Sequence, residues 1–269
     1  MDDLIDTHCH WQDPRLESRC SEWWPQIEIR GWSGMVNGTE PDDWERVAAW
    51  AEKSPLAKPS FGIHPWQVTK ARGDWRERLR SYLERFPGAG VGEIGIDKWI
   101  RDADLPRQKE IFREQWKLAV ELNRPITVHC LQAFGHLLEE LGGLAQPPGG
   151  FLLHAYGGPE ELVEPFLGFG AHFSFNGYFL QERKAAVREI FRKLPEDRLL
   201  VETDAPHMLP PEPFRDEVFP EEHAGENALH HPANLSAAVR GLAGIRGWTL
   251  GETASTTTAN ARRLFALSG

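Results

Sequence analysis

Short apolar runs alternate with longer segments of helical periodicity along most of the chain. The runs are rich in Val, Ile, Leu and Phe, and the segments between them repeat apolar residues three and four positions apart. This alternation is typical of strand–helix–strand units in a parallel sheet. Eight such runs begin near residues 4, 34, 59, 90, 125, 150, 171 and 198. The pattern predicts an α/β protein with eight parallel strands, and this number favours a closed (β/α)8 TIM barrel.

The connecting segments support this prediction. Residues 41–53 carry a helical stripe formed by Trp44, Val47, Ala48 and Ala51, with Pro41 near the first turn. Residues 105–122 repeat the pattern. Near the end of the chain, Thr249 and Glu252 have the spacing of a capping box and predict the start of a closing helix. The stretch 208–232 is too long for an ordinary connection and is interpreted as a lid or a substrate wall.

Length and charge restrict the class of protein. The chain has 269 residues, which matches one barrel, so a single domain over residues 1–269 is expected. A formal net charge of −10 argues against a broad basic surface for duplex nucleic acid. A small phosphate-bearing substrate is compatible with this charge, because bound divalent cations would supply local positive charge. No segment indicates an obligate protein partner.

Cysteine content and the start of the chain bear on the compartment. Three cysteines, Cys9, Cys20 and Cys130, are too few for a disulfide framework and favour a reducing compartment. The first ten residues have no apolar core of a signal peptide, and no run approaches the ~18 apolar residues of a membrane span. A cytoplasmic protein without membrane contact is predicted.

Potential metal ligands stand at the ends of several predicted strands. A lone histidine or carboxylate at such a place is ordinary, but a barrel brings the carboxyl ends of its strands to one rim. The side chains expected there are His8, His10, Asn37, His64, Glu93, Asp97, His129, His154, Asn176 and Asp204. Imidazole nitrogen together with carboxylate oxygen suits Zn, Mn, Fe or Co. Metal chemistry at this rim is the interpretation that explains the whole set.

Six of these side chains, four histidines and two carboxylates, are potential metal ligands. This number is larger than the number of protein ligands that a single catalytic ion with an open position usually has. Two ions that share a carboxylate would accommodate them. We therefore expect His8, His10 and Asp204 to hold one ion, His129 and His154 to hold the second, and Glu93 to bridge. Strand alternation turns Cys9 and Cys130 away from the neighbouring ligands, so both should be small buried apolar residues and not thiolate ligands.

A series of motifs carries a specific resemblance. In chain order they are DTHCH, GIHP, VGEIGID, PITVHC, LLHAYGG, FSFNG and LLVETDAP, and the similarity extends to NARRLF at residues 260–265. This series resembles the TatD family of metal-dependent deoxyribonucleases, within the amidohydrolase-like superfamily. The resemblance implies a (β/α)8 barrel, one or two divalent metals, and hydrolysis of phosphodiester bonds in DNA. It assigns the same six metal ligands: His8, His10, Glu93, His129, His154 and Asp204.

The chain departs from the family pattern beside the ligands. Many members follow the histidine of strand five with Cys-Arg or Ser-Arg, whereas His129 is followed by Cys130, Leu131 and Gln132. A cation suited to a phosphate is therefore missing. Strand six reads HAYGG, and the usual Asn-Glu-Pro of the last loop is replaced by HHP at residues 230–232. The departures concern the substrate and leave the ligand set complete.

The predicted function is metal-dependent hydrolysis, with Zn, Mn or Mg as candidate ions and DNA, as single strands or ends, or a small phosphodiester as substrate. Two ions would lower the pKa of a shared water, Asp204 would act as general base, and Glu93 would hold the pair. His64 and Lys98 are expected to contact substrate. Trp66 and Trp99 could stack a nucleobase, although core packing is the better expectation for most of the 11 tryptophans.

Two alternatives stay open. A hydrolase for a small ester, lactone or amide would keep the metal chemistry and change the bond. A barrel that binds a partner around a structural metal would have no activity, but loss of a ligand is expected there and none is lost.

Overall fold

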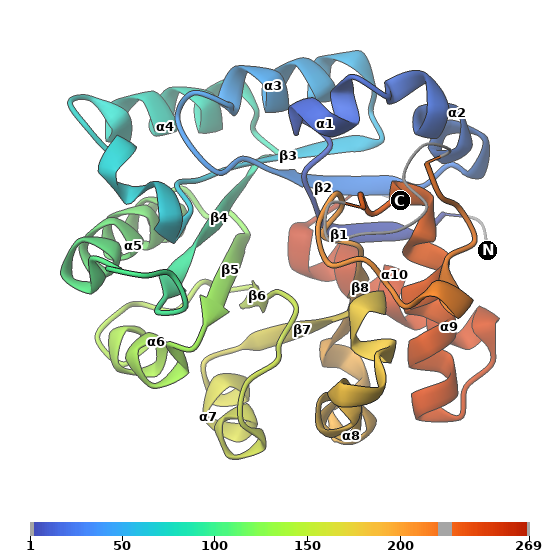
Figure 1. The fold of residues 1–269 in the computed structure, drawn as a ribbon. Coiled ribbons are helices and arrows are strands. Elements are labelled where there is room, and N and C mark those ends of the chain that lie inside the picture. Colours follow the sequence, from blue (N-terminus) through green and yellow to red (C-terminus); the bar gives the residue numbers. More distant parts are fainter. Residues whose placement is uncertain (1–2, 220–227, 268–269) are drawn as a thin grey trace.

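A barrel of eight parallel strands forms the centre of the molecule (Figure 1). The computed structural model describes residues 3–219 and 228–267. Neighbouring strands pair in chain order, and the predicted eight strands are confirmed. They are β1 Ile5–Cys9, β2 Ser33–Asn37, β3 Ala57–Phe61, β4 Gly90–Asp97, β5 Ile126–Leu131, β6 Phe151–Leu153, β7 Ala171–Asn176 and β8 Leu199–Glu202.

The barrel closes where the chain beyond β8 returns to β1. The backbone N–H of Asp204 donates to the carbonyl of His8 at 2.8 Å, and the N–H of His10 donates to the carbonyl of Ala205 at 2.8 Å. The Asp6 carboxylate also accepts the Thr203 backbone N–H at 3.0 Å. This closure places the first and the last expected ligands side by side, although Thr7 of β1 and Val201 of β8, which are joined by a hydrogen bond, lie 194 positions apart in the sequence.

Helices surround the strands on the outside of the barrel (Figure 1). They are α1 Pro14–Glu17, α2 Cys20–Arg30, α3 Trp44–Lys53, α4 Trp75–Arg85, α5 Leu105–Glu121, α6 Phe134–Leu141, α7 Val163–Gly168, α8 Ala185–Lys193, α9 Leu235–Arg246 and α10 Leu250–Phe265. Short 3-10 turns join them: η1 Pro65–Lys70, η2 Glu160–Leu162, η3 Gly177–Leu180, η4 Glu182–Lys184, η5 Glu196–Arg198, η6 Glu212–Phe214 and η7 Pro232–Asn234. No helix of the described residues has both the length and the apolar content needed to cross a membrane.

The predicted helix boundaries are largely confirmed. Thr249 and Glu252 form the expected capping box: the Thr249 hydroxyl accepts the Glu252 N–H, and the Glu252 carboxylate accepts the Thr249 N–H at 2.7 Å. The stripe of α3 is buried except at Ala51, because Trp50 occupies the buried face instead. Pro41 precedes this helix and does not lie in its first turn.

The layer between strands and helices is apolar and holds two of the cysteines. Cys9 is fully buried and Cys130 is buried, and both belong to the main hydrophobic core. Burial raises the pKa of both thiols above the usual value. The prediction that they are buried apolar residues is confirmed.

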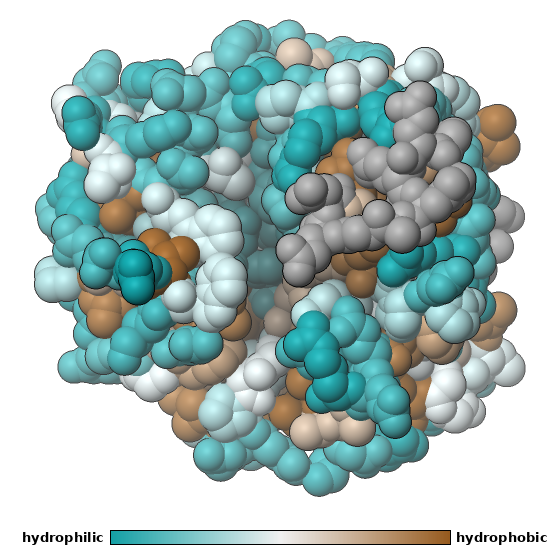
Figure 2. All heavy atoms as spheres, in the orientation of Figure 1, coloured by the Kyte–Doolittle hydropathy of each residue, from teal (hydrophilic) through white to brown (hydrophobic). Residues whose placement is uncertain are grey.

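The long segment after β8 is described only in part. Residues 220–227 of the expected lid lie outside the described residues. The end of the segment packs back on the turn that follows β8, since the His230 backbone N–H donates to the Pro206 carbonyl at 2.9 Å. The face of the molecule that is turned to the viewer in Figure 2 has a hollow near its middle, and hydrophilic residues lie at the floor of this hollow.

Candidate metal centre

Six side chains meet at the carboxyl ends of the strands. His8 lies on β1 and His10 directly follows it, Glu93 lies on β4, His129 on β5, His154 directly follows β6, and Asp204 follows β8. His129 is partly exposed and the other five are buried. The sequence placed Asp204 on the last strand, but β8 ends at Glu202 and Asp204 has a left-handed backbone with φ of 56°. This turn directs its carboxylate toward His8 and His10.

Glu93 stands at the centre of the cluster. Its Oε2 lies 3.4 Å from the Nε2 atoms of both His8 and His10. Its Oε1 lies 3.0 Å from Nδ1 of His129 and 2.9 Å from Nε2 of His154. One carboxylate therefore faces two pairs of imidazoles with its two oxygens.

Asp204 faces only one of these pairs. Its Oδ1 lies 3.4 Å from Nε2 of His8 and 3.3 Å from Nε2 of His10. Within the described residues, three groups have the compactness of a metal site: His8, His10 and Asp204; His8, Glu93 and His154; and His64, Glu93 and His129. None of the three contains a cysteine.

Each of these histidines has one ring nitrogen that points away from the centre and can form a hydrogen bond there. That hydrogen bond determines whether the other ring nitrogen turns a lone pair toward the centre. His10 Nδ1 lies 2.7 Å from the Asn37 carbonyl oxygen, so it must donate there. His129 donates from Nε2 to Asp97 Oδ2 at 2.8 Å in the same way. An imidazole that donates outward from one nitrogen presents a lone pair from the other when it is neutral.

These lone pairs point at carboxylate oxygens, which also carry lone pairs. Such a cluster is repulsive unless a proton or a metal ion lies between the groups. Four imidazole nitrogens and two carboxylates are also the donor types that divalent transition metals take. The residues present therefore fit one or two divalent cations.

The pKa shifts follow from the same arrangement. Burial alone would lower the pKa of His10, but the carboxylates of Asp204 and Glu93 outweigh it and raise the pKa well above its usual value. Burial would raise the pKa of Glu93, but its electrostatic interactions with His64, His8 and His154 outweigh burial and lower the pKa well below its usual value. The cluster thus attracts positive charge strongly.

His64 lies beside the cluster and turns a ring N–H, instead of a lone pair, toward Glu93. Its Nδ1 accepts the Trp66 backbone N–H at 3.1 Å, so the neutral ring carries its proton on Nε2. Nε2 lies 3.6 Å from Glu93 Oε1. Burial lowers the pKa of His64 to about 3, which keeps the ring neutral. His64 is therefore a hydrogen-bond donor aimed at the centre.

Lys98, the other expected substrate contact, lies apart from the ligands. Its side chain is exposed, and its backbone N–H donates to the Leu131 carbonyl at 3.0 Å. It sits at the edge of the barrel mouth, one residue beyond β4.

Two carboxylates contact candidate ligands on the side away from Glu93, and the sequence assigned no role to either of them. Asp97 accepts from His129, and Glu202, which is fully buried, lies 3.4 Å from Nδ1 of His154 through its Oε1. Each fixes the ring of a histidine that faces Glu93. Strand alternation offered a signal for Glu202, because it precedes Asp204 by two residues.

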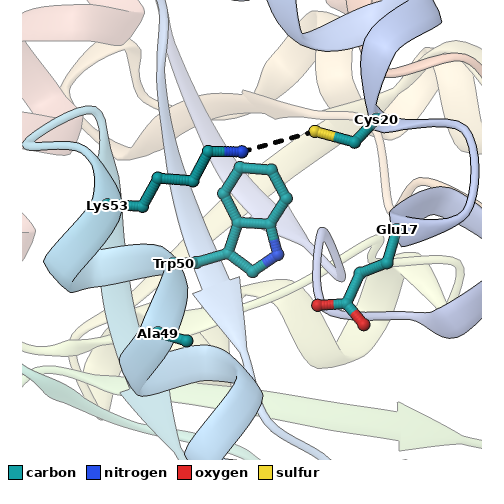
Figure 3. A pocket seen from close by; sticks show the side chains of 5 residues that line it. All are labelled: Glu17, Cys20, Ala49, Trp50 and Lys53. Atoms are coloured by element: carbon teal, nitrogen blue, oxygen red, sulfur yellow. Dashed lines mark hydrogen bonds between the residues drawn. The ribbon is translucent and has the colours of Figure 1, made fainter.

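A separate pocket lies on the outside of the barrel, between α1, α2 and α3 (Figure 3). Its lining residues are Glu17, Cys20, Ala49, Trp50 and Lys53. Figure 3 shows the Lys53 side chain reaching toward Cys20, and its ammonium lies 3.5 Å from the sulfur. None of the six clustered ligands takes part in this pocket.

Known proteins resemble this chain over nearly its full length. The sequence profile described as TatD related DNase matches residues 5–266. The 3'-5' ssDNA/RNA exonuclease TatD of Erwinia tasmaniensis is 32% identical over 240 residues, which cover 88% of this chain and 90% of that protein. An uncharacterized metal-dependent hydrolase of Escherichia coli K12, YjjV, is 33% identical over 209 residues, which cover 76% of this chain and 80% of that one.

Solved structures agree with the sequence comparison. The crystal structure of YjjV superposes with a TM-score of 0.86 at 27% identity and covers 98% of both chains. A TatD family hydrolase from Entamoeba histolytica, with a TM-score of 0.80 at 18% identity and 98% coverage of both chains, supports the fold alone. The match of family, sequence and fold confirms the expected resemblance: this chain is a member of the TatD related DNase family.

Proposed function

We propose that this protein is a divalent-metal-dependent nuclease that hydrolyses phosphodiester bonds at the ends of single-stranded DNA or RNA. The single observation that carries the proposal is the placement of Glu93, whose two oxygens face two separate pairs of histidines. Two ions bridged by one carboxylate are a recurrent device for displacement at phosphorus. The TatD exonucleases at about 30% identity support single-stranded nucleic acid as the substrate.

Each residue of the cluster has a proposed role. His8, His10 and Asp204 would hold one ion, His129 and His154 the second, and Glu93 would contact both. When bound, the ions supply the positive charge that lowers the pKa of a water and neutralises the phosphate. The candidate ions are Zn, Mn and Mg, because all three accept carboxylate oxygen as a ligand.

The chain's own groups handle the proton and the phosphate. Asp204 turns Oδ1 toward His8 and His10, so we assign its Oδ2 to accept the proton of the attacking water. The Nε2–H of His64 donates a hydrogen bond to a phosphate oxygen. Lys98, at the edge of the mouth, contacts the phosphate of a neighbouring nucleotide by charge.

A second candidate function follows from one observation. Leu131 is 38% exposed at the end of β5, where many family members carry a basic residue. An apolar side chain there suits a small ester, lactone or amide better than a long polyanion. This candidate shares the metal centre and differs only in the bond hydrolysed.

The compartment is part of the proposal. All three cysteines, Cys9, Cys20 and Cys130, are free. A reducing compartment keeps thiols in this state, and we therefore infer that the protein works in the cytoplasm.

The deciding experiment is cleavage of end-labelled single-stranded oligonucleotides by protein loaded separately with Mg, Mn or Zn. The variant Asp204→Asn should retain the fold and lose about 10²- to 10⁴-fold in rate, the usual loss for a general base. Asp197→Asn, an exposed carboxylate outside the barrel, is the matched control and should cleave like wild type. A blank gel with every metal, together with hydrolysis of small esters, would transfer the proposal to the second candidate.

A further inference from the structure

Two of the eleven tryptophans are much more exposed to solvent than the others. Eight are buried and Trp248 is half-buried, whereas Trp66 is 46% exposed and Trp99 is 60% exposed. Both follow strands at the open end of the barrel: Trp66 lies in η1 after β3, and Trp99 lies two residues beyond β4. The exposure of two indoles is therefore concentrated at the rim that holds the candidate metal centre.

The two rings are neighbours at this rim. Their centroids are 6.3 Å apart and their planes differ by 24°, so the indoles are stacked and roughly parallel. The π face of each exposed indole can stack with a planar ring. We call this pair, Trp66 and Trp99, the rim indoles.

The rim indoles are tied to the metal centre by hydrogen bonds. Trp66 Nε1 donates to Asp97 Oδ2 at 2.8 Å, and the same oxygen accepts from His129 Nε2 at 2.8 Å. The Trp99 backbone N–H donates to Asp97 Oδ1 at 2.6 Å. One carboxylate therefore orients both the rim indoles and a candidate metal ligand. Because the indole N–H of Trp66 is already engaged, its ring face is what it offers to a ligand.

Neighbouring residues extend this surface. Leu131 is exposed and lies opposite Asp97 in the pairing of β4 and β5, so an apolar side chain stands at the same rim. Lys98 lies between Asp97 and Trp99 in the chain and is exposed. An apolar π surface with a cation at its edge matches a nucleotide, which has a planar base and a charged phosphate.

We propose that the rim indoles stack the base of the terminal nucleotide of a single strand while its phosphodiester lies at the metal centre. The inference rests on the proposed nuclease function and adds a base-binding subsite to it. Bases in a duplex interior are stacked on both faces by their neighbours, so only a terminal or unpaired base can stack on this surface. The rim indoles would thus select single strands without reading base identity.

Trp99 offers the cleaner variant for a test. Its contact with Asp97 is made by the backbone, so Trp99→Ala removes the ring and keeps the hydrogen bonds of Asp97 and His129. Trp99→Phe retains an aromatic face and should restore most of the effect. Ile29→Ala, an 86% exposed residue on α2, is the control for loss of a surface apolar side chain.

The kinetic test compares a single-stranded oligonucleotide with the same strand lacking the base of its terminal nucleotide. Stacking contributes about 1–3 kcal/mol per base, so wild type should prefer the complete strand by about 5- to 150-fold in kcat/KM. Trp99→Ala should abolish this preference through KM, with little change in kcat and none on the abasic strand. Equal use of both strands by wild type, or an equal loss on both in the variant, would overturn the inference.

A binding test separates this inference from the proposed function. An oligonucleotide with a terminal 5-iodouracil is irradiated with the protein in EDTA, and the crosslinked peptide is mapped by mass spectrometry. A crosslink at Trp66 or Trp99 without cleavage by any metal-loaded protein would keep the base subsite and overturn nuclease activity. Cleavage with no crosslink at either indole would keep the activity and overturn the subsite.

Discussion

The two ends of the barrel are built from the same strands but differ in the kind of side chain that they contain. Near the amino ends of the strands, residues of four strands pack with the last helix in a buried apolar cluster formed by Ile5, Met35, Leu152, Leu200, Ala261, Leu264 and Phe265. At the carboxyl ends, the corresponding positions are histidines and carboxylates. Hydrophobic burial therefore closes one end, and the other end holds the candidate metal ligands.

Histidine shows the difference between the two ends most clearly. At the carboxyl end, burial lowers the pKa of His154, but Glu93 and Glu202 outweigh it and raise the pKa well above normal. His172 stands near the amino end of β7, where burial and the charges of Arg198 and Arg263 lower its pKa to about 4. The same side chain is thus prepared for a cation at one end and kept neutral at the other. In this barrel, the residues that stabilise the fold lie at the amino ends of the strands, and the candidate chemical groups lie at the carboxyl ends of the same strands.

The largest effect is expected for Glu93→Gln. Loss of the carboxylate charge that faces both histidine pairs should reduce metal content and lower the cleavage rate by more than about a thousandfold, since metal stabilisation amounts to several kcal/mol and 1.4 kcal/mol is tenfold. Metal analysis and single-turnover cleavage measure both quantities. Full metal content and full rate in the variant would remove Glu93 from the centre.

A large effect of another kind is expected for Phe265→Ala at the closed end. The ring is 2% exposed, and its truncation should lower the free energy of unfolding by about 3–5 kcal/mol. Urea denaturation measures the loss, and the rate per folded molecule should not change. Leu250→Ala, on the same helix but 43% exposed, is the control and should change stability by about 0.5 kcal/mol or less. A fall in the rate of the folded Phe265→Ala protein would show that the ends are coupled.

A smaller effect is expected for Glu202→Gln, which changes the group behind His154. The neutral amide holds the ring less firmly and makes it a weaker ligand, so metal affinity should fall by about 10- to 100-fold. Competition with a chelator measures the affinity. Glu196→Gln, an exposed glutamate in η5, should leave it unchanged. An affinity equal to wild type in Glu202→Gln would show that this contact does not support the centre.

The smallest effect is the acid sensitivity contributed by His172. Its pKa falls from 6.5 in the unfolded chain to about 4 in the fold, so the folded protein binds fewer protons and acid favours unfolding. Its contribution is complete above pH 6.5 and declines as the pH falls toward 4. The loss between pH 7 and pH 5.5 should be about 1 kcal/mol. His172→Gln should flatten the stability curve in this window, and an unchanged slope would contradict the assignment.

Local periodicity determined the eight strands, the extent of α5 to within one residue and the capping box of α10. It also determined the outward position of Cys9, because side chains in a strand alternate whatever packs around them. The same rule brought His8 and His10 to one face. The family motifs placed the remaining ligands at strand ends, where barrel topology gathers them.

Only the tertiary structure decided which groups surround the ligands. Asp97 and Glu202 became partners of histidines because strands distant in sequence lie next to each other in the barrel. The left-handed turn at Asp204 depends on closure against β1. The exposure of Trp66 and Trp99 could not be read from composition, since eight other tryptophans are buried. Burial and orientation are set by neighbours from elsewhere in the chain, and a local pattern holds no information about them.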